Sequence, residues 1–71
     1  MVYTDGVHLV SDSEEELHKF AKIIGLKLDW FQNHRYKHYD LTSLRMVSKA
    51  LINGAVFISS REIVKKLKKS W

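Results

Sequence analysis

The sequence RYKHYDLTSLR (residues 35–45) is an extended stretch that leads directly into the start of a helix. Thr42 or Asp40 is suited to cap that helix, and Gly54 is suited to end it. The residues after Gly54 are continuously apolar, as in a strand that is covered on both faces. We therefore predict a βαβ-like unit in which the strand at 55–59 lies in the centre of the sheet.

The N-terminal part of the chain predicts a hairpin. Two short β-type runs are separated by Asp5 and Gly6, a pair favoured in tight two-residue turns where both residues have positive φ. Alternation along the second run places Val7 and Leu9 on one face, and His8 on the other.

Apolar residues spaced three or four positions apart predict three amphipathic helices. Ser11 with Glu14, or Ser13 with Glu16, forms a capping box for the first helix, and residues 59–62 form one for the third. The expected buried stripes are Leu17, Phe20, Ala21 and Ile24; Leu44, Val47, Ala50 and Leu51; and Ile63, Val64, Leu67 and Trp71. We predict one compact α/β domain over residues 1–71, with α+β as the alternative.

Composition bounds the class of protein. The 71 residues include no Cys, 45% are hydrophobic and 28% are charged, which is typical of a single globular domain. A domain this small without disulfides needs good packing, self-association or a non-thiolate metal for stability. We expect a soluble, cytoplasmic protein, because no apolar run is long enough to span a bilayer and no signal pattern begins the chain.

Two further features were assigned structural roles. The net charge of +4 is concentrated in residues 61–71, which we interpret as a solvated helix face rather than a site for an anionic partner. Of the adjacent rings Trp30 and Phe31, one is expected to cap the core and the other to cover an edge. His18 is expected on the surface of the first helix, one turn after Glu14.

The central stretch supports several chemical interpretations. His38 and Asp40 share one face of a strand, so they could bind a metal with His8 and Asp5, but we interpret them as a hydrogen-bonded pair and assign no metal site. A helix start with nearby cations could bind an anion. Cations interleaved with rings over residues 35–39 could bind nucleic acid.

We predict binding of a phosphate-bearing ligand, a nucleotide or a nucleic-acid backbone, at the start of the second helix. Arg45 would pair with the phosphate, and His38 would donate a hydrogen bond while Asp40 fixes its tautomer. The full set of ligand-binding residues is His8, His38, Asp40, Thr42, Ser43 and Arg45, with Asp5, Asp12 and Lys37 in possible support. The cofactor is left open.

Two other functions compete with this prediction. A protein–protein interaction module that acts as a homo-oligomer would expose Trp30, Phe31 or Trp71 as an apolar patch. A metal-assisted phosphoester hydrolase would use His38 as a general base, with Arg45 stabilising the developing charge. No serine elbow, Gly-rich phosphate loop or catalytic Cys accompanies these residues.

The sequence also resembles a family of small bacterial and phage proteins known only as a domain of unknown function. The resemblance covers nearly the whole chain, and its most specific part is His38-Tyr39-Asp40 followed by Arg45. Family members have a longer loop where this chain has only Asp5 and Gly6. The resemblance implies a bacterial or phage cytoplasmic setting and one polar site made of Asp5, His8, Asp12, His38, Asp40 and Arg45.

Overall fold

A computed structural model describes residues 1–33 and 37–69, without the side chains of the last two. Five strands form one mixed sheet, in the order β3-β4-β2-β1-β5. The elements are β1 (Val2–Thr4), β2 (His8–Ser11), α1 (Glu14–Ile23), the 3-10 helix η1 (Leu28–Trp30), β3 (Phe31–Asn33), β4 (Lys37–Asp40), α2 (Leu44–Ile52), β5 (Val56–Phe57) and α3 (Ser60–Lys69). Arg35 and Tyr36 of the predicted stretch of interleaved cations and rings, and the predicted core residue Trp71, lie outside the described residues.

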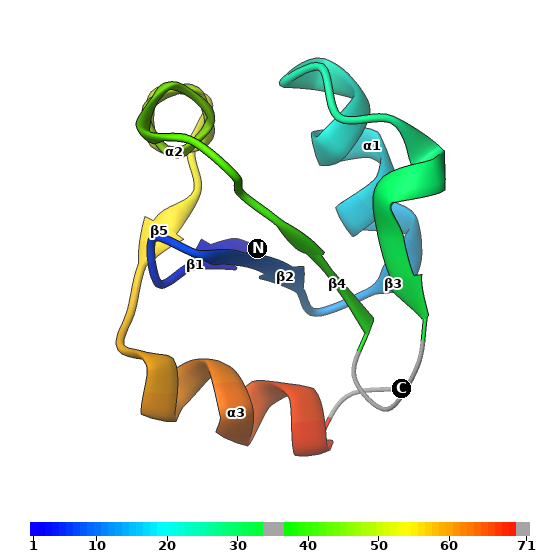
Figure 1. Cartoon of the computed structure of the whole chain (residues 1–71). Helices are drawn as coiled ribbons and strands as arrows, with labels where there is room; N and C mark the ends of the chain where they lie inside the picture. Colours follow the sequence, from blue (N-terminus) through cyan, green and yellow to red (C-terminus); the bar gives the residue numbers. More distant parts are fainter. Residues whose placement is uncertain (34–36, 70–71) are drawn as a thin grey trace.

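The sheet is covered on both faces. Figure 1 shows α1 and α2 on one side of the strands and α3 on the other. Strand β4 is antiparallel to β2, β2 is antiparallel to β1, and β1 is parallel to β5. It follows that β4 and β5 point the same way and that α2 connects them, so the predicted α/β class and βαβ-like unit are confirmed.

The central position predicted for the strand at 55–59 is wrong. Strand β5 spans only Val56–Phe57 and pairs with β1 at one edge of the sheet. Within this apolar run Ala55 is buried, whereas Phe57 is 61% exposed. A short apolar run cannot distinguish a central strand from an edge strand, and here the N-terminal hairpin occupies the centre.

The hairpin itself is confirmed, but its turn differs from the prediction. Thr4 pairs with Leu9, so four residues lie between the paired positions, and only Gly6 in this loop has positive φ, at 95°. The side chain of Asp5 stabilises the loop by accepting hydrogen bonds from the backbone amides of Val7 and His8 at 2.9 and 2.8 Å. The aspartate therefore acts through its carboxylate rather than through a left-handed backbone.

Side-chain caps define where the helices begin. Ser13 caps α1 by accepting from the Glu16 amide at 3.2 Å, so the second of the two predicted registers is correct. Ser59 accepts from the Glu62 amide at 3.2 Å, which confirms the predicted cap of α3. Helix α2 is capped by Ser43, not by the predicted Thr42 or Asp40.

The main core lies between the sheet and the α1 and α2 helices. The predicted stripe of α1 is confirmed, and Ala50 is the buried residue of α2. Leu44 was predicted to be buried but is 86% exposed, because Met46 and Val47 turn toward the sheet instead. The residues that form this core are Val2, Leu9, Leu17, Phe20, Ala21, Ile24, Leu26, Tyr39, Leu41, Ala50 and Ala55.

His18 is packed rather than fully on the surface. Its Nδ1 lies 2.7 Å from the hydroxyl of the buried Tyr39, and its ring meets that of Phe31 edge to face at 4.5 Å between centroids. Nε2 lies 3.3 Å from Glu14, one turn earlier on α1, as the spacing predicted. Phe31 packs against the core, which confirms the role predicted for one of these two rings, while Trp30 remains 46% exposed.

None of the described helices combines the length and the apolar character needed to cross a bilayer.

Candidate functional site

The α3 face of the sheet carries a cluster of two histidines and an aspartate. His8 on β2 pairs with Asp40 on β4, and His38 lies two residues before Asp40 on the same strand. Because alternate residues of a strand share a face, His38 and Asp40 point to the side opposite Tyr39, which is in the main core. Each of the three offers one ligand atom, and these atoms lie within 4.8 Å of one another.

Contacts within the cluster are short. His38 Nε2 lies 3.3 Å from Asp40 Oδ1, and the rings of His8 and His38 meet edge to face with their centroids 5.3 Å apart. The histidine–aspartate pair expected from the sequence is thus present as a close contact between the two side chains. The second histidine, brought by another strand, lies close enough to share a ligand with it.

Asp5 orients His8. His8 Nδ1 donates to Asp5 Oδ2 at 3.0 Å, since a carboxylate that is ionised can only accept. The same oxygen accepts a hydrogen bond from the hydroxyl of Ser60, the first residue of α3, at 2.9 Å. With the proton held on Nδ1, Nε2 of His8 is the ring nitrogen that can bind a metal.

The Asp5 carboxylate is held in its ionised form. Its side chain is only 2% exposed, and burial alone would raise the pKa. Hydrogen bonds from the His8 amide, the His8 ring, the Val7 amide and Ser60 outweigh that burial and hold the pKa of Asp5 well below its ordinary value. A buried carboxylate with this set of donors is a rigid support for an imidazole.

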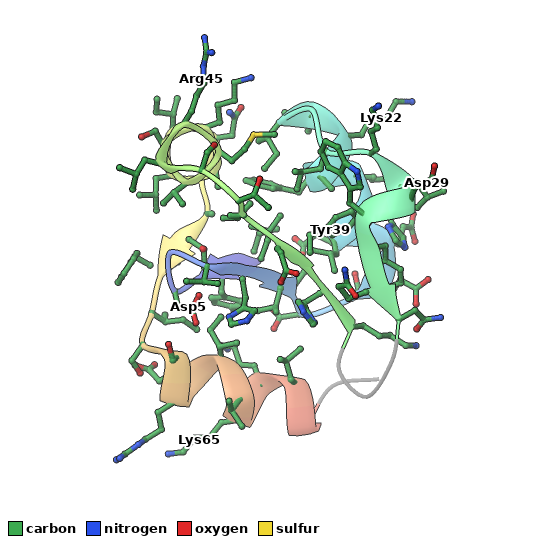
Figure 2. All side chains as sticks on the ribbon, viewed as in Figure 1. Asp5, Lys22, Asp29, Tyr39, Arg45 and Lys65 are labelled. Carbon is green, nitrogen blue, oxygen red and sulfur yellow. The ribbon has the colours of Figure 1, made fainter. Side chains whose placement is uncertain are left out.

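A small cavity of 140 Å³ lies between this cluster and α3. Asp5, His8, His38 and Ser60 form its polar lining, and Ile63, Val64 and Leu67 of α3 form its apolar lining. Figure 2 shows Asp5 on the side of the sheet that faces α3. The histidines are therefore partly shielded by α3, whereas the side chain of Asp40 is 47% exposed.

The remaining predicted site residues lie elsewhere. Arg45 projects from α2 away from the sheet, at the opposite side of the molecule from Asp5 (Figure 2). Asp12 contacts the N-terminal amine at 3.3 Å and the Tyr3 hydroxyl at 3.1 Å, at the other end of the hairpin from Asp5. The structure therefore brings together His8, His38, Asp40 and Asp5, but not Arg45 or Asp12.

Three more predicted residues have roles outside the cluster. Lys37 forms an ion pair with Glu14 of α1 at 3.4 Å, on the other face of β4. Ser43 accepts from the Met46 amide as the cap of α2. Thr42 follows β4 and lines a separate hollow, which it shares with Asp40.

Sequence reasoning did not find Ser60, because a residue 55 positions away from Asp5 carries no local signal of the contact. Gln32 was also missed, although it pairs with His38 across the β3–β4 hairpin and so shares its face. If the β3–β4 hairpin had been predicted from the aromatic residues before it, Gln32 could have been placed beside His38.

The arrangement has the side-chain types and the convergence of a candidate transition-metal site. Bonds of about 2.0–2.2 Å to one ion place its ligand atoms roughly 3–4 Å apart. Here all three ligand atoms lie within 4.8 Å of one another, and His38 Nε2 and Asp40 Oδ1 are already 3.3 Å apart, so small side-chain rotations would bring the set around one ion. Two imidazoles and one carboxylate are ligands that suit zinc, iron or other divalent first-row ions.

Fold and site together define a small α/β domain with a candidate metal centre on one face of its sheet. The chain belongs to the family described as "Protein of unknown function (DUF4031)", whose model matches residues 4–70. No curated protein and no solved structure matches the chain.

Proposed function

We propose that this protein binds a divalent transition-metal ion through His8, His38 and Asp40 and uses it to hold a phosphate-bearing ligand. The observation that carries the proposal is the convergence of three ligand atoms, from two neighbouring strands, within 4.8 Å. Asp5 supports it, because histidines that bind metals usually donate their other ring nitrogen to a carboxylate or carbonyl.

Three protein ligands leave at least one coordination position for another molecule. Two neutral histidines and one carboxylate leave a divalent ion with one net positive charge in its coordination shell. An anionic oxygen, such as that of a phosphate group, is the complementary ligand. This mode of phosphate binding replaces the role that sequence reasoning gave to Arg45, which points away from the cluster (Figure 2).

Calorimetric titration with cobalt(II) tests the metal site. We expect one ion per chain, with a visible absorption spectrum that reports nitrogen and oxygen ligands. His8→Ala and His38→Ala should each lower the affinity at least 10-fold, because each removes a direct ligand. His18→Gln is the matched control, since it removes an imidazole that contacts Tyr39 rather than the cluster. Equal affinity in all four proteins would rule out the site.

Inorganic phosphate tests the second half of the proposal. The cobalt-loaded protein should bind phosphate, and the same protein treated with a chelator should not. Phosphate affinity that is unaffected by the chelator would show that the anion binds somewhere other than the metal.

The open coordination position also favours a second function, the metal-assisted hydrolysis of a phosphoester. Held by His8, His38 and Asp40, the ion would supply an activated water for attack on the phosphoester. The proton of that water would pass to the departing alkoxide, which leaves as the alcohol. Turnover of bis(p-nitrophenyl) phosphate by the cobalt-loaded protein, absent in His38→Ala, is the expected result.

A further inference from the structure

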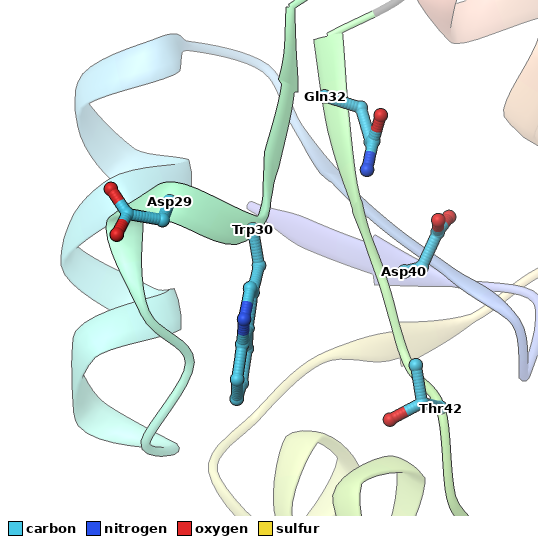
Figure 3. Close-up of a pocket in the computed structure, with 5 residues that line it drawn as sticks. All are labelled: Asp29, Trp30, Gln32, Asp40 and Thr42. Atoms are coloured by element: carbon cyan, nitrogen blue, oxygen red, sulfur yellow. The ribbon is translucent and has the colours of Figure 1, made fainter.

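A second hollow adjoins the candidate metal centre. It has a volume of 310 Å³ and is lined by Asp29, Trp30, Gln32, Asp40 and Thr42 (Figure 3). Asp40 belongs to both sites, so a ligand held by the metal would have this hollow beside it.

Strand register explains why these residues meet. Gln32 pairs with His38, so alternation places Gln32 on the same face as Asp40, and Trp30 at the end of η1 and Thr42 just after β4 complete the lining. Figure 3 shows Trp30, Gln32, Asp40 and Thr42 around the open side of the β3–β4 hairpin, with the carboxylate of Asp29 turned away from them. The hairpin and the segments that flank it thus bring a candidate metal ligand, an indole ring, an amide and a hydroxyl to one hollow.

Trp30 is more exposed than packing of the core requires. Its neighbour Phe31 fills the core side, with its ring centroid 5.4 Å from that of Tyr39. Trp30 itself is 46% exposed, and Nζ of Lys27 lies 5.7 Å from the centroid of its ring. An accessible indole in a polar hollow offers a surface on which a planar ring can stack.

We propose that this hollow binds the base of a nucleoside monophosphate whose phosphate is held by the metal. The base stacks on Trp30, and the Gln32 amide and Thr42 hydroxyl each offer both a donor and an acceptor to its edge. The volume lies at the lower end of the range for small-molecule sites, about 300–1,000 Å³, which suits one nucleoside rather than a longer strand. The inference rests on the proposed metal site, because the metal supplies the phosphate contact.

The test compares nucleoside monophosphates with ribose 5-phosphate, which has the same sugar phosphate but no base. In calorimetry with the cobalt-loaded protein, at least one of AMP, GMP, CMP and UMP should bind about 5- to 150-fold more tightly than ribose 5-phosphate, the range expected for stacking of one base on one aromatic side chain. Equal affinity for all five compounds would overturn the inference and leave the metal site intact.

Trp30→Leu should remove this preference without changing the affinity for cobalt or for ribose 5-phosphate. Trp30→Phe keeps a ring and should retain part of the preference, so it serves if the leucine variant fails to fold. Phe57→Leu is the matched control, because Phe57 is an exposed aromatic residue on the opposite edge of the sheet. A preference that survives in Trp30→Leu would contradict the stacking role.

The two proposals fail in different ways. A wild-type protein that binds no cobalt would refute the metal site, and the nucleotide inference would fall with it. A protein that binds cobalt and phosphate but does not distinguish nucleotides from ribose 5-phosphate would refute only the base site.

Discussion

The two faces of the sheet differ in chemistry although they belong to the same five strands. On the α1 and α2 face, Leu9 and Tyr39 join an apolar core. On the α3 face, the neighbouring residues of the same strands are His8, His38 and Asp40. Because side chains alternate between faces, β2 and β4 can place Leu9 and Tyr39 in the main core and offer His8, His38 and Asp40 as ligands on the other side, where Val10 is also buried. Residues of the main core and candidate ligands thus alternate along the same two strands.

A substitution on the core face should have the largest effect on stability. Leu17 is fully buried at 0% exposure, and Leu17→Ala should cost about 2–5 kcal/mol by creating a cavity. A domain of 71 residues is stable by only about 4–11 kcal/mol, so the variant should be close to unfolding.

Urea denaturation followed by circular dichroism would measure the change. Asp40→Ala is the contrasting variant on the α3 face, and because the Asp40 side chain is 47% exposed its cost should be below about 1 kcal/mol. Similar losses in the two variants would mean that the α3 face also supports the fold, and the proposed division between the faces would be wrong.

Asp5→Asn should have the next largest effect, on metal affinity. Asparagine keeps the size of the side chain but removes the charge that fixes the Nδ1 proton of His8. Loss of such a supporting carboxylate typically costs 10- to 100-fold in metal affinity.

Cobalt titration of Asp5→Asn and of the control Asp12→Asn would check this prediction. Asp12 is a carboxylate at the other end of the same hairpin, where it contacts the N-terminal amine and Tyr3. If both variants bind cobalt as the wild type does, Asp5 has no part in holding the histidine for a metal.

Tyr39 gives the core face a dependence on alkaline pH. Burial, and to a smaller extent the charge of Glu14, raises the pKa of Tyr39 above its ordinary value of 10. Above about pH 10 the unfolded chain releases this proton first, which lowers the free energy of the unfolded state, so the folded state loses stability as the pH rises.

The effect of Tyr39 is at most about 1.4 kcal/mol per pH unit. Unfolding free energies measured at pH 8, 10 and 11 should therefore fall more steeply for the wild type than for Tyr39→Phe. Parallel curves for the two proteins would show that the hydroxyl ionises as readily in the folded state as in the unfolded one.

Arg45→Ala should have the smallest effect. The side chain projects away from the sheet, and both the unfolding free energy and the cobalt and phosphate affinities should change by no more than about 0.5 kcal/mol (Figure 2). A larger loss of phosphate affinity would return this arginine to the site and would place the anion at the start of α2.

Local signals predicted the elements of the fold well. The serine caps of α1 and α3 and the buried stripe of α1 depend on residues within one or two helical turns, so the sequence carries them directly. The central position given to the strand at 55–59 and the burial given to Leu44 were wrong. Both features depend on which surfaces pack against each other in the folded protein, and short-range sequence patterns do not determine that.

The candidate site shows the same division. His38 and Asp40 share a face because they are two residues apart, and the hairpin brings His8 to them as expected. Arg45 was joined to this group through its position in the chain, but the first turn of α2 carries it to the other side of the molecule. Ser60 reaches Asp5 from the far end of the chain, which no short-range pattern encodes.

The hydrogen bond between Ser60 and Asp5 spans 55 residues of sequence. The carboxylate that orients His8 is itself oriented by the first residue of the last helix. Docking of α3 therefore adds one further hydrogen bond to a carboxylate that the hairpin loop already holds, so the last helix to be made helps to fix a ligand near the start of the chain.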